Sequence, residues 1–257
     1  CRFDCPGEAS KVVALDRVTR WVHGHYARAA QLREVFAGQA IFTGEAPATE
    51  RPEGWPPTRY EAKAIAAGLY AANMPVEVGG AGLDTLSWLL YEKELGRANY
   101  ALHWTCVARP SNILLAGNAE QREQYLMPCI RGETWDCLAM TEPGAGSDAA
   151  ALRTKAVRDG EHYVLDGVKQ FISGAGVSDV YVVMARTGSE GPRGISAFIV
   201  EKGTPGLSFG PNEEKMGWHA QPTAQVILDG VRVPAANLLG GTEGIGFTIA
   251  MSGLNGG

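Results

Sequence analysis

The chain has 257 residues, of which 45% are hydrophobic and 20% charged, and its formal net charge is -5 at pH 7. Those values describe an ordinary globular protein of one large or two modest domains, and the acidic balance argues against a nucleic-acid-binding surface. No apolar run is long enough for a membrane-spanning helix, and the five irregularly spaced cysteines fit neither a disulfide framework nor a zinc site. We therefore expect a reducing compartment, with no metal, no nucleic acid and no membrane span.

The first half of the chain has the composition and periodicity of helices. Helices are predicted over residues 32–42, 59–72, 84–98 and 119–130. Asp84 occupies the N-cap position of the third helix, and Asn118 with Gln121 has the spacing of a capping box before the fourth. This pattern predicts an N-terminal all-α domain over residues 1–134.

From residue 135 the pattern changes to short strands rich in Val, Ile and aromatic residues, separated by Gly, Pro, Asn or Asp. Strands are predicted over residues 135–141, 162–167, 179–186, 195–202, 207–210 and 224–234. Such a series is typical of an antiparallel barrel or sandwich, and a helical pattern resumes near residue 244. The fold class predicted is α+β and multidomain, with a middle β domain over 135–240 and the start of a further helical domain over 241–257.

A Gly-rich loop, "TEPGAGSD" at residues 141–148, directly follows the first predicted strand. It lacks the Gly-Lys-Ser/Thr of a P-loop, and it does not fit the Gly-x-Gly-x-x-Gly fingerprint. Its backbone N–H groups and the hydroxyls of Thr141 and Ser147 could bind a phosphate or a polar ring. An ordinary turn uses the same residue types, so both interpretations stay open on spacing alone.

A second stretch, "FIS" at residues 171–173, lies between two predicted turns. Phe171 could stack on a flat heteroaromatic ring, and the Ser173 hydroxyl could form a hydrogen bond at the edge of that ring. The alternative is a plain strand with Phe171 in the core.

Taken together and in this order, the motifs resemble the acyl-CoA dehydrogenase family. The resemblance rests on "AMTEPGAGSD", "GVKQFISGAG", "KGTPGLSF", "KMGW" and "VRVPAANLLG", and it extends from about residue 60 to the end of the chain. "FISGAG", "VEKGTPGLSFG" and "GLNGG" are most similar to the isobutyryl-CoA branch, which acts on short and branched acyl chains. The resemblance implies a helical domain, a middle β-barrel domain and a C-terminal four-helix domain, with FAD between the last two.

The same resemblance assigns site residues. The cofactor-binding residues it implies are Leu138, Met140, Thr141, Gly144, Gly146, Ser147, Phe171, Ile172 and Ser173, and the substrate-binding residues are Ser147, Asn255, Gly256 and Gly257. Phe171 matches a position usually held by a Trp stacked on the flavin, and Ser173 matches a Thr whose hydroxyl reaches flavin N5. Thr141 would donate to the pyrimidine edge, and Ser147 would lie near the FAD pyrophosphate and the pantetheine arm of CoA.

The implied reaction is the α,β-dehydrogenation of a short or branched acyl-CoA, in which a carboxylate removes the α-proton and a hydride passes from the β-carbon to flavin N5. In the family this glutamate lies late in the C-terminal domain or, in a minority, at the position matched by Gly257. Because glycine cannot act as a base, we predict no catalytic base within the printed sequence, and we expect the rest of the C-terminal domain to lie beyond it.

The resemblance also implies partners and leaves two alternatives. We expect an electron-transfer flavoprotein or a similar acceptor, and a homodimer or homotetramer. The compartment expected is a bacterial cytoplasm, or the mitochondrial matrix in a eukaryote. The alternatives are a flavin-dependent monooxygenase or oxidase on the same fold, and a non-catalytic scaffold that binds acyl-CoA.

Overall fold

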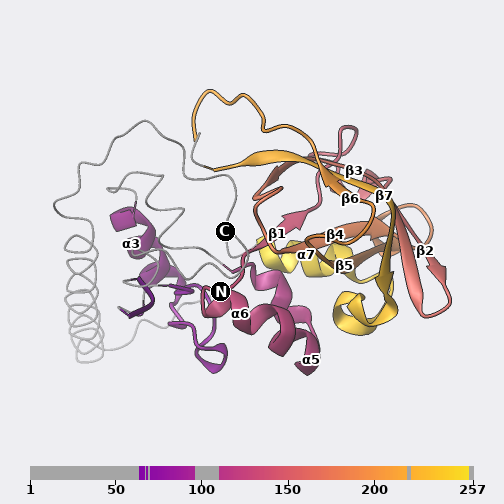
Figure 1. The fold of residues 1–257 in the computed structure, drawn as a ribbon. Helices are drawn as coiled ribbons and strands as arrows, with labels where there is room; N and C mark the ends of the chain where they lie inside the picture. The colour runs from indigo at the N-terminus through magenta and orange to yellow at the C-terminus, as the bar shows by residue number, and fades with distance from the viewer. Residues whose placement is uncertain (1–63, 67, 69, 96–109, 219–220, 255–257) are drawn as a thin grey trace, which may run out of the picture.

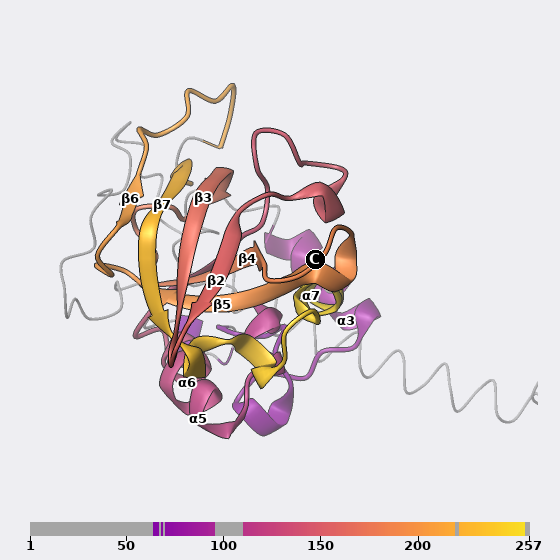
Figure 2. The ribbon, with the colours of Figure 1, turned by 90° about the vertical axis from the view of Figure 1, so that its right-hand side faces the viewer.

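The structure is a computed structural model that describes residues 64–66, 68, 70–95, 110–218 and 221–254. Seven strands of this described part form one curled sheet, and helices lie beside it and below it in Figures 1 and 2. The strands are β1 (Asp136–Ala139), β2 (Lys155–Asp159), β3 (His162–Ser173), β4 (Val180–Arg186), β5 (Ile195–Glu201), β6 (Leu207–Phe209) and β7 (Thr223–Pro234).

The helical elements are mostly short. Within the described residues, the α-helices are α3 (Thr85–Leu95), α5 (Ala119–Gln121), α6 (Met127–Ile130) and α7 (Gly246–Leu254), and the π-helical η3 (Arg122–Leu126) joins α5 to α6. The 3₁₀ turns are η1 (Val76–Val78), η2 (Asn112–Ala116), η4 (Ala149–Ala151), η5 (Pro192–Gly194), η6 (Ala235–Asn237) and η7 (Leu239–Gly241).

The sheet is mixed. The strand order is β1-β4-β2-β3-β7-β6, with β5 paired to the other side of β4. The β2–β3, β3–β7, β4–β5 and β6–β7 pairs are antiparallel, whereas β1 runs parallel to β4, and β2 meets β4 in parallel at one residue pair. The long connection between β1 and β4, which contains the β2–β3 hairpin, permits the parallel pairing. The predicted class is confirmed, and the curled sheet departs from a purely antiparallel barrel at these two contacts.

Strand β4 separates two hydrophobic cores. Successive side chains of a strand point to opposite faces, and almost every residue of β4 is buried. Val182 and Met184 belong to the cluster that includes the helices, while Tyr181 and Val183 belong to the cluster inside the curl of the sheet. Because both faces are covered, the sequence of β4 is a continuous apolar run and not an alternating one.

Both predicted helix caps are confirmed. The Asp84 carboxylate accepts a hydrogen bond from the Ser87 N–H at 2.8 Å, in the first turn of α3. Asn118 accepts from the Gln121 N–H at 2.8 Å, and Gln121 accepts in return from the Asn118 N–H at 3.1 Å. This capping box opens the helical run from α5 through η3 to α6, which follows the predicted helix over 119–130.

The structure differs from the sequence predictions at one helix and one strand. The helix predicted over 59–72 is wrong in its second half, because Gly68 has φ 67° and Ala71 has φ 53°, which are left-handed conformations that end a helix. Strand β2 was not predicted, since "KAVRD" is mostly charged and exposed and buries only Ala156. The helix predicted over 32–42 lies outside the described residues.

The helix expected near residue 244 is confirmed as α7, which packs against strand β5 and against the 3₁₀ turn η2. Gly246 lies so close to the backbone of Ser196 and Ala197 that a Cβ atom would come within 2.7 Å of both. That contact explains the glycine at the start of α7. The domain boundaries at residues 134 and 240 stay predictions.

Candidate cofactor and substrate site

The Gly-rich loop after β1 is an ordered, tight turn. Glu142 and Ala145 form an antiparallel bridge in which each N–H donates to the other's carbonyl oxygen at 3.1 Å. Pro143 and Gly144 therefore occupy the two turn positions, and both are exposed, as are Gly146 and Ser147, whereas Ala145 between them is buried. The two hydrogen bonds of this bridge hold the turn in one conformation.

The glycines of this loop are not required by the chain itself. Neither Gly144 nor Gly146 has a positive φ, and a Cβ added to either would meet nothing within 4 Å. By contrast, a Cβ on Gly206 would lie 2.3 Å from the Asp229 carbonyl oxygen. Neither backbone conformation nor packing within the chain explains why positions 144 and 146 are glycine. The open space beside them would allow a ligand to approach the backbone closely.

Phe171 has a strained backbone conformation and an exposed side chain, at an irregularity of β3. Its φ is +58°, which is unusual for an aromatic residue, and 61% of its surface is exposed. The register between β3 and β7 shifts between Lys169 and Ile172, as expected for a β-bulge. Such outliers concentrate at functional sites, because a folded protein otherwise has little reason to retain them.

A backbone hydrogen bond brings the two predicted motifs together. The Gln170 N–H donates to the Thr141 carbonyl oxygen at 2.8 Å, so the bulge of β3 lies beside the end of β1. The side chains of Gln170 and Gln225 are also hydrogen-bonded, and Gln170 in turn donates to Glu213 at 2.7 Å. The site is therefore formed by the end of β1, the bulge of β3 and the chain after β6.

Most of the predicted cofactor residues are at least partly exposed. Leu138 and Met140 are half-buried against the helical core, Thr141 is half-buried, and Gly144, Gly146, Ser147, Phe171 and Ser173 are exposed. Ile172 differs, because its side chain is only 3% exposed and packs inside the curl of the sheet. Only its backbone can therefore face a ligand. Asn255, Gly256 and Gly257 lie outside the described residues.

Sequence reasoning missed a buried ion pair beneath the surface. Lys169 Nζ lies 2.8 Å from Glu142 Oε1, and both side chains are buried. Lys169 also donates to the Met140 carbonyl oxygen at 3.2 Å. Glu142 follows the predicted contact Thr141, and Lys169 lies two residues before the predicted contact Phe171. The motifs "AMTEPGAGSD" and "GVKQFISGAG" therefore contain both partners, but nothing in them indicates that the two side chains meet.

The pair is electrostatically coupled. Burial lowers the pKa of Lys169 to about 8, although the Glu142 carboxylate partly offsets that effect. Burial alone would raise the pKa of Glu142, but the Lys169 charge and the hydrogen bonds it receives outweigh burial and lower the pKa. Among these hydrogen bonds are those from the Arg153 N–H at 2.6 Å and the Thr154 N–H at 2.9 Å.

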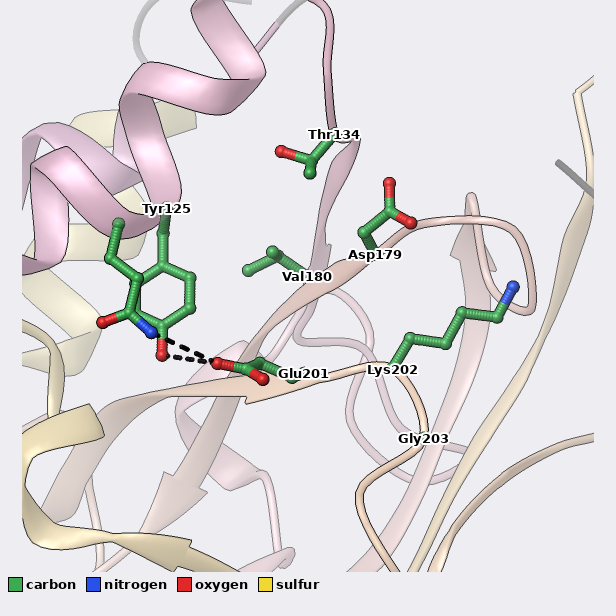
Figure 3. A pocket seen from close by; sticks show the side chains of 8 residues that line it. Tyr125, Thr134, Asp179, Val180, Glu201, Lys202 and Gly203 are labelled. Carbon is green, nitrogen blue, oxygen red and sulfur yellow. Dashed lines mark hydrogen bonds between the residues drawn. The ribbon is translucent and has the colours of Figure 1, made fainter. Parts of the chain in front are cut away.

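A hollow of about 640 Å³ lies away from these residues, between η3 and the β4–β5 pair (Figure 3). The Tyr125 hydroxyl donates to Glu201 at 2.8 Å there, and burial together with Glu201 raises the pKa of Tyr125 to about 12. The lining residues are Gln124, Tyr125, Thr134, Asp179, Val180, Glu201, Lys202 and Gly203. None of them belongs to the predicted cofactor site.

Asp136, at the start of β1, provides a test of the electrostatics. Burial raises its pKa to about 6, although the Ser111 N–H donates to its two carboxylate oxygens at 3.0 and 3.1 Å. Because this folded pKa exceeds the unfolded value near 3.8, the stabilising contribution is present below that value and is lost as pH rises to about 6. We expect the stability of the parent relative to Asp136→Asn to fall between pH 4 and pH 7. Chemical denaturation at each pH measures the difference in free energy of unfolding between the two proteins. A difference that does not change with pH would contradict a raised pKa for Asp136.

Within the described ranges, no group of three or more His, Cys, Asp or Glu side chains is placed to hold a metal ion. No helix in the same part of the chain is both long enough and apolar enough to cross a bilayer.

Two family models match the chain. The N-terminal domain of acyl-CoA dehydrogenase matches residues 31–133, and the middle domain of acyl-CoA dehydrogenase matches residues 137–231. The isobutyryl-CoA dehydrogenase of Bos taurus mitochondria is 48% identical over 201 residues, which cover 76% of this chain and 47% of that protein. The chain thus spans about half the length of the curated relatives it matches.

Solved structures agree with this match. An acyl-CoA dehydrogenase from Geobacillus kaustophilus has a TM-score of 0.75 and 32% identity, covering 90% of this chain and 61% of that one. A glutaryl-CoA dehydrogenase from Mycobacterium smegmatis, solved in complex with FADH2, has a TM-score of 0.72 and 26% identity, covering 91% of this chain and 59% of that one.

Proposed function

Because the chain belongs to the acyl-CoA dehydrogenase family, we propose that it forms the FAD-facing wall of a dehydrogenase for short or branched acyl-CoA thioesters. The observation that carries the proposal is the juxtaposition of two features that the chain itself does not need. These are the open space beside Gly144 and Gly146 and the exposed, left-handed Phe171, joined by the Gln170–Thr141 hydrogen bond.

The residues present fit a flavin dinucleotide. The chemistry supplied by FAD when bound is acceptance of a hydride from the β-carbon of the acyl thioester. Phe171 offers a flat apolar face to cover the flavin ring, and the hydroxyls of Thr141 and Ser173 can hold its polar edge. Gly144 and Gly146 leave the backbone accessible to phosphate oxygens, and Ser147 offers a hydroxyl to the phosphate or to the pantetheine arm.

The substrate class proposed is a short, branched acyl-CoA. It is supported by the 48% identity to isobutyryl-CoA dehydrogenases from Bos taurus and Dictyostelium discoideum. We further propose that Asn255, Gly256 and Gly257 contact the CoA end of the substrate, that electrons leave to an electron-transfer flavoprotein or similar acceptor, and that the enzyme is a homodimer or homotetramer.

Anaerobic reduction of the full-length protein tests the function. We expect it to purify yellow with FAD, to reject FMN, and to be bleached by isobutyryl-CoA much faster than by octanoyl-CoA. An acyl chain too long for the pocket is excluded by packing, whereas each methylene group that fits contributes only about 0.8 kcal/mol to the binding free energy. A colourless protein that ignores added FAD would refute the proposal. Bound FAD that no acyl-CoA reduces would instead favour the monooxygenase or oxidase alternative.

A substitution in the Gly-rich loop separates ligand contact from folding. We expect Gly146→Ala to change the free energy of unfolding by less than about 0.5 kcal/mol, because its Cβ meets no atom of the chain. Binding of FAD or acyl-CoA should nevertheless weaken by roughly tenfold, equivalent to about 1.4 kcal/mol. Gly188→Ala, at an exposed position between β4 and β5, is the matched control and should leave binding unchanged. Equal titration curves for Gly146→Ala and the parent would remove the loop from the site.

A further inference from the structure

The buried Glu142–Lys169 pair connects three segments that surround the candidate site. Lys169 donates from β3 to Glu142 and to the Met140 carbonyl oxygen. Glu142 accepts in addition from the backbone N–H groups of Arg153 and Thr154, which precede β2. A single ion pair thereby joins the end of β1, the entry to β2 and the bulged part of β3.

The hydrogen-bonding capacity of the carboxylate is used on both oxygens. Oε1 accepts from Lys169 and from the Thr154 N–H, and Oε2 accepts from the Arg153 N–H. A neutral amide at this position would turn a donor toward one of those N–H groups. The arrangement therefore requires a charged carboxylate and is more specific than a contact that merely fills space.

A purely stabilising role does not explain why such a pair is retained. Buried ion pairs cost desolvation, and well-packed apolar side chains of similar volume often stabilise a fold as well or better. What an apolar pair cannot do is hold three backbone segments by hydrogen bonds. The segments held here include the residue after Thr141 and the residue two before Phe171.

We propose that Glu142 and Lys169 are positioning residues that fix the Thr141 carbonyl region and the Phe171 bulge in the geometry that binds the flavin. This proposal rests on the proposed FAD site, although neither side chain is exposed enough to contact a ligand itself. The pair acts through the Met140 carbonyl and through the β3 backbone, and its loss should loosen the site even where the fold survives.

The test compares three variants of the full-length protein. Lys169→Met removes the ammonium and leaves Glu142 charged, and the double variant Glu142→Gln/Lys169→Met removes both charges. Val226→Ala is the matched control, because Val226 is the cross-strand partner of Lys169, is fully buried, and belongs to neither motif. It weakens the same part of the sheet while leaving the ion pair in place.

The readouts are the Kd for FAD, measured by fluorescence quenching on apoprotein, the melting temperature, and amide hydrogen exchange at residues 170–173. We expect the double variant to recover much of the melting temperature lost by Lys169→Met. Its Kd for FAD should still be about tenfold or more above the parent value, with faster exchange at the bulge. Val226→Ala should lose melting temperature with a Kd within about twofold of the parent.

Two outcomes would overturn the proposal. One is a double variant that binds FAD as tightly as the parent, which would leave the pair with a role in stability alone. The other is a Val226→Ala protein that loses as much FAD affinity as the double variant at the same loss of melting temperature. If the parent itself does not bind FAD, the proposed function fails first, so the two failures are distinguishable.

Discussion

Phe198→Ala is expected to lower the free energy of unfolding by about 3–5 kcal/mol, the range for removing a buried aromatic ring. Phe198 is 0% exposed in the middle of β5, and its ring lies 4.8 Å from the ring of Tyr163, centroid to centroid. It also pairs across the sheet with Val183 of β4. The cavity left by alanine would lie where β3, β4 and β5 converge and could collapse only by moving strands.

Urea denaturation of the full-length protein measures this effect. Val157→Ala is the control, since Val157 lies on β2 with 61% of its surface exposed and should change stability by no more than about 0.5 kcal/mol. A loss below about 1 kcal/mol in Phe198→Ala would mean that the core inside the curl is loosely packed, contrary to the burial seen here.

The second large effect is expected from Lys169→Met. Removing one partner of a buried ion pair leaves an uncompensated charge, which typically costs about 3–5 kcal/mol. The side chain of Lys169 is 0% exposed and that of Glu142 only 7% exposed, so water cannot readily replace the lost partner. Glu142→Gln/Lys169→Met should be more stable than Lys169→Met, because it leaves no buried charge behind.

The pH dependence of stability provides an independent test of the Lys169→Met prediction. In the parent, Lys169 lowers the pKa of Glu142, so the contribution of that carboxylate is present above about pH 4.5 and is lost as pH falls through the lowered value. In Lys169→Met burial acts alone and favours the protonated acid. The gap in stability between parent and variant should therefore narrow as pH falls from 7 toward 4. A gap that stays constant over this range would show that Glu142 is not the uncompensated charge.

Local preferences account for the elements that were predicted well. The caps at Asp84 and Asn118 depend on side chains within three residues of the backbone groups that they satisfy, so spacing alone indicates them. Most strands were visible because their β-branched and aromatic runs are interrupted by Gly, Pro, Asn or Asp. Strand β2 was missed because it has no such run, and its one buried residue gives too weak a periodic signal.

The site shows a similar division. The residue types of "TEPGAGS" and "FIS" indicate a polar loop and an aromatic contact, and the family resemblance connects them to a flavin. Their separation of more than 20 residues along the chain says nothing about whether they meet. The Gln170–Thr141 hydrogen bond that joins them depends on β3 passing beside the end of β1, which is a property of the sheet.

The sequence by itself determined most of the local elements, both helix caps and, through its motifs, the family. Only the tertiary structure decided that β1 runs parallel to β4, that Phe171 lies at a bulge with φ +58°, and that Lys169 meets Glu142 in the interior. The physical reason is the separation along the sequence over which each interaction acts. Capping and turn preferences act over a few residues, whereas strand pairing and the desolvation of a charge depend on segments that become neighbours only when the chain has folded.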